Sequence, residues 1–243
     1  LGYLNSGILN GQKHLSTLLL QNDNSVYPDR QKDSKMDHPF LDYAASNVFT
    51  HVSRMDSADE TLFAALDEFM RIENPAFISW YRLARPHHRV SDVSPLHVAA
   101  HDGVLNYCQH LIKLGHDING LDGDLRTPIS WASRKGHASI VALLLENGAN
   151  ADLFGKDGLN PLHYAAMTNQ FLIVRLLLAA GVNPMTPRFM KHPRMRCGNS
   201  TCTVANTPLK YACQGGCAEA VVEFVKYLSA EELDRALGCA ARA

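Results

Sequence analysis

The sequence predicts an all-α fold, a solenoid of stacked helix-turn-helix repeats. The first observation is a short motif around a proline that recurs at Pro95, Pro128 and Pro161, in steps of 33 residues. The second is that apolar residues follow each proline at helical spacing. A fixed period with one motif per copy is typical of repeat architectures, in which each repeat contacts only its neighbours.

The first helix of each repeat is predicted to start at the proline. Thr127 precedes Pro128, and its hydroxyl is expected to accept a hydrogen bond from an amide of the first helical turn. Proline at the first helical position loses no hydrogen bond. Eight residues after each proline stands a residue that tolerates left-handed backbone and ends the helix. These residues are Gly103, Gly136, Asn169 and, in a fourth copy that begins at Pro208, Gly216.

The second helix of each repeat is predicted from paired apolar residues. Ile140, Val141, Leu144 and Leu145 follow the i, i+1, i+4, i+5 spacing of one buried stripe, and the residues from Ile173 to Leu178 repeat it. Each of these helices is expected to end at a glycine twenty residues after the proline. These glycines are Gly115, Gly148 and Gly181.

The repeated stretches, with this period, resemble the ankyrin repeat; they are Ser94-Pro-Leu-His-Val-Ala-Ala100, Thr127-Pro-Ile-Ser-Trp-Ala-Ser133 and Asn160-Pro-Leu-His-Tyr-Ala-Ala166. We place the repeats at residues 91–123, 124–156, 157–189 and 204–230, with a truncated fifth copy at 231–243, inside a repeat region of 91–243. His97 and His163 occupy the histidine of the family motif, and Ser130 and Lys210 replace it in the other copies. We expect each histidine to bond to the loop of the neighbouring repeat and assign it no metal-binding or catalytic role.

The fourth copy starts 14 residues late because of an insertion between Pro184 and Asn206, where the family has its hairpin finger. The segment holds Arg188, Lys191, Arg194 and Arg196 and no acidic residue, which leaves about −5 on the rest of a chain whose net charge is −1. Two interpretations stay open, a solvated loop without a role and a recognition finger for an acidic partner. Nucleic acid is disfavoured as a partner, because the patch is short and the chain is not basic.

The same segment offers thiols and an imidazole to a metal. Zinc takes four such ligands in tetrahedral geometry. We expect no cofactor, and a zinc site is kept as a minor alternative. Its ligands would be His192, Cys197, Cys202 and Cys213.

The N-terminal third is expected to form no repeat. Residues 1–37 are interpreted as a loop or the tail of a preceding domain, and residues 38–90 as a helical linker that caps the repeats. Three helices are predicted there, one from Pro39 to about Val52, one after the capping box Ser57–Glu60, and one around Phe77 to Leu83.

The order of parts, Pro39-Phe-Leu-Asp-Tyr-Ala-Ala45, then Trp80-Tyr-Arg-Leu-Ala-Arg85, then the repeats, resembles fungal NLR-like proteins of the STAND class. In that class the segment joins a nucleotide-binding NACHT domain to an ankyrin array. The resemblance implies a fragment of a longer protein, whose array senses a ligand protein. These 243 residues contain no Gly-x-x-x-x-Gly-Lys-Ser/Thr phosphate loop, so nucleotide would bind only through a domain absent from this sequence.

The amino-acid composition predicts the kind of protein and its cellular compartment. The chain is 46% hydrophobic and 19% charged, as in soluble folded proteins, and no apolar run reaches the length of a membrane span. Six cysteines without regular pairing favour a reducing compartment, and we expect the cytoplasm. No catalytic motif is present, and Cys108 and His110 are predicted to lie on different sides of a helix, so we expect no enzyme.

The function predicted from the sequence is protein–protein interaction through hairpin tips and first helices. The alternative is a scaffold or substrate adaptor with a different N-terminal domain. Trp131, Tyr164 and Tyr211 share one position and either fill the seam between helices or anchor a partner. The candidate partner-binding residues are His101, Asp102, Asp124, Arg126, Trp131, Arg134, Lys135, Lys156, Asp157, Tyr164, Met167, Thr168, Arg188, Lys191, Arg194, Arg196, Tyr211 and Gln214.

Overall fold

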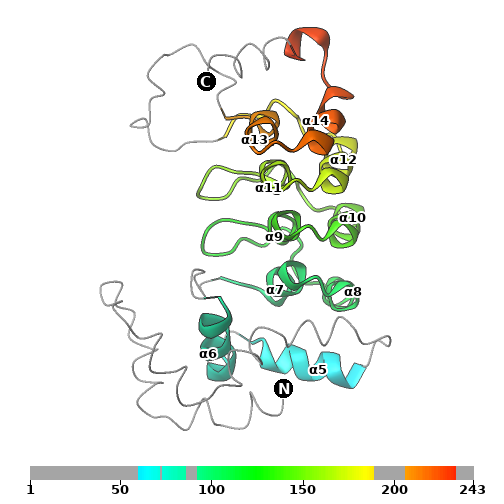
Figure 1. Ribbon diagram of the computed structural model, residues 1–243. Coiled ribbons are helices and arrows are strands. Elements are labelled where there is room, and N and C mark those ends of the chain that lie inside the picture. The colour runs from blue at the N-terminus through cyan, green and yellow to red at the C-terminus, as the bar shows by residue number, and fades with distance from the viewer. Residues whose placement is uncertain (1–59, 72, 86–91, 189–205, 234–243) are drawn as a thin grey trace, which may run out of the picture. The chain divides into compact units, whose positions relative to one another are not determined.

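The computed structural model describes residues 60–71, 73–85, 92–188 and 206–233 (Figure 1). It divides into two compact units, residues 1–95 and 96–243. The regular structure of the described residues is helical, as predicted. The helix predicted from Pro39 and the capping box residue Ser57 lie outside these residues. None of the described helices is long and apolar enough to span a membrane.

The N-terminal unit contains α5 (Glu60–Phe69) and α6 (Pro75–Ala84), which confirms two of the three helices predicted there. Asn74 caps α6, since its side-chain oxygen accepts from the Ala76 amide at 2.9 Å. The two helices share an aromatic core in which the rings of Phe69, Phe77, Trp80 and Tyr81 lie 5.8 to 6.4 Å apart.

The C-terminal unit is a stack of four helix pairs. The first helices form one row and the second helices another, and neighbours pack along and between the rows (Figure 1). The first row is α7 (Pro95–Asp102), α9 (Pro128–Lys135), α11 (Pro161–Met167) and α13 (Pro208–Gln214). The second row is α8 (Leu105–Lys113), α10 (Ala138–Glu146), α12 (Phe171–Ala179) and α14 (Ala218–Val225).

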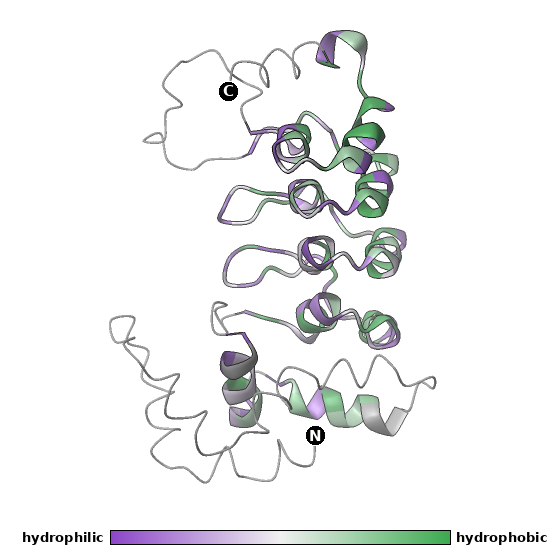
Figure 2. Cartoon of the chain, viewed as in Figure 1, coloured by the Kyte–Doolittle hydropathy of each residue, from purple (hydrophilic) through white to green (hydrophobic). Residues whose placement is uncertain are grey.

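The second row supplies the apolar stripe that the sequence predicts. Ile140, Val141 and Leu144 of α10 are buried, as are Ile173, Val174, Leu177 and Leu178 of α12. Leu145 is only half-buried, so the predicted stripe is narrower in α10. Figure 2 shows α10, α12 and α14 as strongly hydrophobic helices, and each of them packs against helices of both rows.

The predicted helix ends are largely confirmed. Gly103, Gly136, Asn169 and Gly216 all have left-handed backbone, with φ between 54° and 84°. Thr207 caps α13 through its side chain, and Asn160 caps α11. The prediction for Thr127 is wrong, because its hydroxyl makes no cap bond and instead pairs with the Ser130 hydroxyl at 3.0 Å. Serine has replaced the motif histidine there, and this brings a second hydroxyl within reach.

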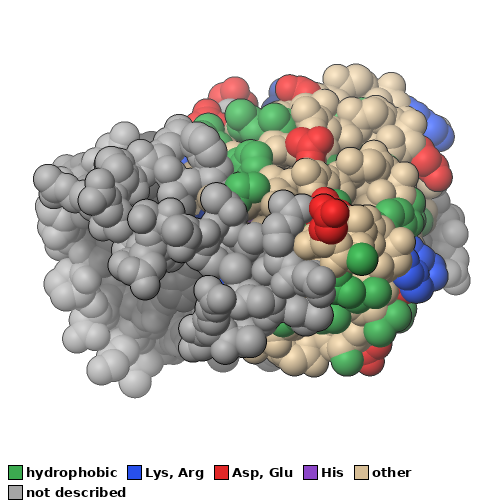
Figure 3. Space-filling view, turned by 90° about the horizontal axis from the view of Figure 1, so that it is seen from above, with side chains coloured by type: hydrophobic (Ala, Val, Ile, Leu, Met, Phe, Trp, Pro, Cys, Tyr) green, Lys and Arg blue, Asp and Glu red, His purple; other side chains and the backbone are tan. Residues whose placement is uncertain are grey.

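The end of the stack at α14 is apolar. Val222 and Val225 are 57% and 42% exposed, whereas Leu178, which corresponds to Val225 one repeat earlier, is 4% exposed. Figure 3, viewed from above, shows hydrophobic side chains on this end. Beyond α14, residues 230–233 begin another helical segment, which Ser229 caps through reciprocal bonds with Glu232. The rest of the predicted fifth copy lies outside the described residues.

Candidate binding face

A hairpin whose base is closed by one backbone bond precedes each of the helices α9, α11 and α13. The Asp122 amide donates to the Arg126 carbonyl at 3.0 Å, and the Gly155 amide to the Leu159 carbonyl at 3.0 Å. The third hairpin is closed in the same way, by the Arg188 amide and the Asn206 carbonyl at 2.9 Å. Asp122, Gly155 and Arg188 are 33 residues apart, so the inserted residues fall between the two base residues of the third hairpin. The predicted insertion therefore belongs to the hairpin itself.

Trp131 fastens the first of these hairpins to α9. Its indole Nε1 donates to Asp122 Oδ2 at 2.9 Å, and both side chains are buried. Arg126 Nε donates to the same carboxylate oxygen of Asp122 at 3.1 Å, and Arg126 Nη2 donates to Asp124 Oδ2 at 2.8 Å. The guanidinium carbon of Arg126 lies 5.2 Å from the centre of the Trp131 ring. A buried carboxylate needs such partners, and here they hold the hairpin in one conformation.

Tyr164 fastens the second hairpin to α11. Its hydroxyl donates to Asp157 Oδ2 at 2.6 Å. Burial, together with this bond, raises the pKa of Tyr164 well above its usual value. Trp131 and Tyr164 are 3% and 5% exposed, so they fill the helix seam, which was one of the two alternatives for these aromatics. Tyr211 at the same position is half-buried, with its ring 6.0 Å from that of His163.

The two motif histidines bond to the neighbouring repeat, as expected. His97 Nε2 donates to the Arg126 carbonyl at 2.9 Å, and His163 Nε2 donates to the Asn206 carbonyl at 3.2 Å. His163 Nδ1 lies 2.6 Å from the side-chain oxygen of Asn160 and 3.4 Å from the backbone nitrogen of the same residue. Burial lowers the pKa of His163 to about 4 and also lowers the pKa of His97. Both imidazoles are therefore neutral near pH 7, as their burial requires.

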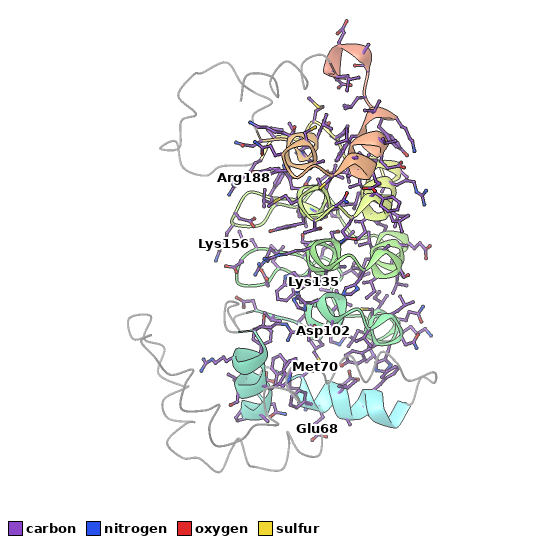
Figure 4. The ribbon with its side chains drawn as sticks, in the orientation of Figure 1. Glu68, Met70, Asp102, Lys135, Lys156 and Arg188 are labelled. Carbon is purple, nitrogen blue, oxygen red and sulfur yellow. The ribbon has the colours of Figure 1, made fainter. Side chains whose placement is uncertain are left out.

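Neighbouring hairpins are also joined to each other. The Lys156 amide donates to the Asp124 carbonyl at 2.7 Å, and Lys156 Nζ donates to the Gly123 carbonyl. One repeat later, Arg188 Nε donates to the Asp157 carbonyl at 2.7 Å. Basic side chains thus connect the second hairpin to the backbone of the first, and the third hairpin to the backbone of the second. Figure 4 shows Lys156 and Arg188 on the hairpin side of the stack.

The remaining candidates lie where the first helices end. His101 and Asp102 are half-buried at the end of α7 and bond to each other at 2.7 Å. The exposed ones are Arg134 and Lys135 of α9, Met167 at the end of α11 with Thr168 directly after it, and Gln214 of α13. We call the hairpins and the first-helix ends together the binding face. Lys191, Arg194 and Arg196 lie outside the described residues.

Two residues of this face are absent from the sequence-based selection. Asp122 pairs with both Trp131 and Arg126, and Lys210 is half-buried in the first turn of α13. Asp122 had a signal in the sequence, since it lies four residues before Arg126 within the predicted hairpin. Lys210 stands at the motif histidine position, where His97 and His163 bond to the base of the next hairpin in their own repeats.

The described residues show no cluster of three or more metal-ligating side chains. Of the four candidate zinc ligands, Cys213 is exposed on α13 and the other three lie outside the described residues. The zinc alternative stays a prediction that metal analysis of the purified protein tests. Burial raises the pKa of the Cys108 thiol to about 12, and so keeps Cys108 in the protonated, unreactive form.

The geometry agrees with the comparison to known protein families. Residues 89–188 match the family described as ankyrin repeats, in three copies. This segment consists of ankyrin repeats. The helix pair α13–α14 lies beyond the match and continues the same stack.

Similar segments occur in larger proteins of several kinds. The palmitoyltransferase AKR1 of Lachancea kluyveri is 36% identical over 90 residues, which are 37% of this chain and 12% of that protein. Human palmitoyltransferase ZDHHC13 is 40% identical over 75 residues, 30% of this chain and 12% of that protein. The rat nuclear factor NF-kappa-B p105 subunit is 33% identical over 91 residues, 36% of this chain and 9% of that protein. The chain thus matches only about a tenth of each relative, and none of these names supports the resemblance to fungal NLR-like proteins.

Proposed function

We propose that this chain is a non-catalytic protein-interaction module that binds a partner protein on the binding face. The observation that carries the proposal is the difference between the buried side chains, which hold the hairpins, and the exposed ones. Buried groups such as Trp131, Tyr164 and Asp122 hold the hairpins. Arg134, Lys135 and Met167 are exposed at the ends of first helices, and within the described residues their side chains form no hydrogen bond or ion pair. A surface that is already ordered loses little entropy on binding.

We select the residues that anchor the partner by the exposure of their side chains. Met167 is 47% exposed at the end of α11, and Tyr211 is half-buried one repeat further on. Aromatic and flexible apolar side chains supply much of the energy of protein interfaces. We assign these two residues contact with the partner, and we assign Trp131 and Tyr164 the positioning of the hairpins.

Affinity capture from a lysate tests the module. The baits are the full chain, a variant in which residues 189–205 are replaced by a three-residue loop like 123–125, and the triple variant R134A/K135A/M167A. A matched control, K113A/R175A/L172A, changes exposed residues of the second row. The proposal expects a protein that the full chain and the control retain and that the binding-face variant loses. Equal retention by all four baits would contradict it.

We further propose that the array is the sensing part of a STAND-type signalling protein of the cytoplasm. The order of sequence motifs from Pro39 to Arg85 supports this context, and the free thiols of Cys108, Cys213 and Cys217 agree with a reducing compartment. Reading the coding sequence upstream of the Leu1 codon tests it. A phosphate-binding loop there would support the sensor, and an F-box would support the substrate-adaptor alternative instead.

A further inference from the structure

The acidic side chains of the binding face already have partners within it. Asp102 bonds to His101, Asp122 to Trp131 and Arg126, and Asp124 to Arg126. Asp157 accepts from the Tyr164 hydroxyl. The negative charge on this face is therefore engaged in holding the hairpins and first helices.

The basic side chains are paired differently. Among the described residues, Arg134, Lys135 and Lys210 have no carboxylate partner. Lys156 and Arg188 donate to backbone carbonyls, and no carboxylate in the described part of the chain pairs with either. Of the cations on this face, Arg126 is the one that carboxylates neutralise within the described part of the chain.

These five cations come from three successive repeats. Arg134 and Lys135 lie at the end of α9, Lys156 in the second hairpin, and Arg188 and Lys210 at the junction with the fourth repeat. Figure 4 shows Lys135, Lys156 and Arg188 at successive levels of the stack.

We propose that the binding face recognises an acidic, extended segment of the partner protein. This inference rests on the proposed function and specifies the charge and conformation of the partner segment. Packed helices are about 8–10 Å apart and an extended chain advances about 3.3 Å per residue, so roughly three residues of the segment cross one repeat. A carboxylate at about every third position meets the cations of successive repeats.

Exposed ion pairs are individually weak and are screened by salt, so several must form together. A phosphate backbone fits this face less well, because Asp124 and Asp157 lie among the cations and the whole chain has a net charge of −1.

The test uses a fluorescein-labelled decapeptide with Glu at every third position between Gly and Ser residues, and its Gln counterpart. Fluorescence anisotropy is measured with the full chain at 50 and 300 mM NaCl. We expect the Glu peptide to bind, the Gln peptide not to bind, and salt to weaken the complex at least fivefold. The double variant R134E/K135E should lose at least tenfold in affinity.

The matched control is K113E/R175E, which introduces the same charge change on exposed residues of the second row. Its affinity should stay within twofold of the unmodified chain, and circular dichroism checks that both variants fold. Equal losses in the two double variants, binding of the Gln peptide, or tighter binding of a short single-stranded DNA would overturn the proposal. If capture still identifies a partner that R134A/K135A/M167A loses, the interaction module stands and only the acidic segment is wrong.

Discussion

His163 shows how one buried side chain joins two repeats. It lies in α11, is fully buried, and donates to the Asn206 carbonyl at the base of the next hairpin. Burial disfavours the charged imidazolium, which is why the pKa of His163 falls to about 4.

A pH dependence of stability follows from His163. In the unfolded chain its imidazole titrates near 6.5, so between pH 6.5 and 4 the unfolded chain binds more protons than the folded one. The contribution of His163 is complete above pH 6.5, and the free energy of unfolding falls by roughly 3 kcal/mol as the pH drops towards 4. Urea unfolding at pH 7.5 and 4.5 measures it. His163→Gln should show a smaller drop, because it removes this contribution and leaves that of His97; an equal drop would contradict the assignment.

Trp131 offers a second test at this scale. Trp131→Ala removes a buried ring and its bond to Asp122, and should lower the free energy of unfolding by about 3–5 kcal/mol. Trp131→Phe keeps most of the volume and removes the bond, and should cost about 1–3 kcal/mol. Both are measured by urea unfolding. Affinity for a captured partner should change little in folded Trp131→Phe, and a large loss of affinity with unchanged stability would assign Trp131 a direct contact instead.

Two glycines at helix ends share a left-handed backbone but differ in the space that a larger side chain would find. Gly103 and Gly148 both have left-handed backbone, with φ of 81° and 85°. A Cβ on Gly148 would meet nothing within 4 Å, whereas a Cβ on Gly103 would lie 2.6 Å from His137 Cε1. The His137 ring is itself fixed, since its Nε2 donates to the His101 carbonyl at 2.9 Å.

Gly148→Ala should therefore cost only the backbone strain, about 1–2 kcal/mol. Gly103→Ala should cost more, because the ring must move and its bond to His101 is lost. Thermal unfolding of both variants checks the order. The double variant G103A/H137A should be less destabilised than the sum of its single variants, and simple additivity would show that the contact with His137 is not the cause.

At the scale of the whole stack, each helix pair buries the apolar surface of the one before it. Leu209, Ala212, Ala220 and Phe224 of the fourth pair are buried, and α13 and α14 pack on α11 and α12. In such a solenoid, stability is close to a sum over repeats and their interfaces.

Ending the chain at Arg188 removes the fourth helix pair and the Asn206 acceptor of His163. It should lower the free energy of unfolding by several kcal/mol, since burial of one large side chain contributes about 1.5–3 kcal/mol. Urea unfolding measures the change, with the variant that replaces residues 189–205 by three residues as control. That control keeps α13 and α14 and should unfold close to the unmodified chain. Equal midpoints for the truncated chain and the control would contradict a cooperative stack.

The sequence by itself determined the helices and their period. Prolines at the starts, left-handed residues at the ends and one apolar stripe per helix act within a few residues of each other, so Pro128, Gly136 and Ile140 predict α9 and α10 from local preferences alone. It also placed the exposed candidates Arg134, Lys135 and Met167 correctly at the ends of first helices.

Only the tertiary structure decided which side chains pair. The bonds of Asp122 with Trp131 and of Arg188 with Asp157 join residues 9 and 31 positions apart, and each forms only if its two atoms are placed to within a few tenths of an ångström. No local pattern fixes such distances, because they arise from how successive repeats stack. In the stacked repeats the carboxylates of the binding face bond to neighbouring side chains, whereas five of its cations have no carboxylate partner among the described residues. The numbers of acidic and basic residues in the sequence do not predict this difference.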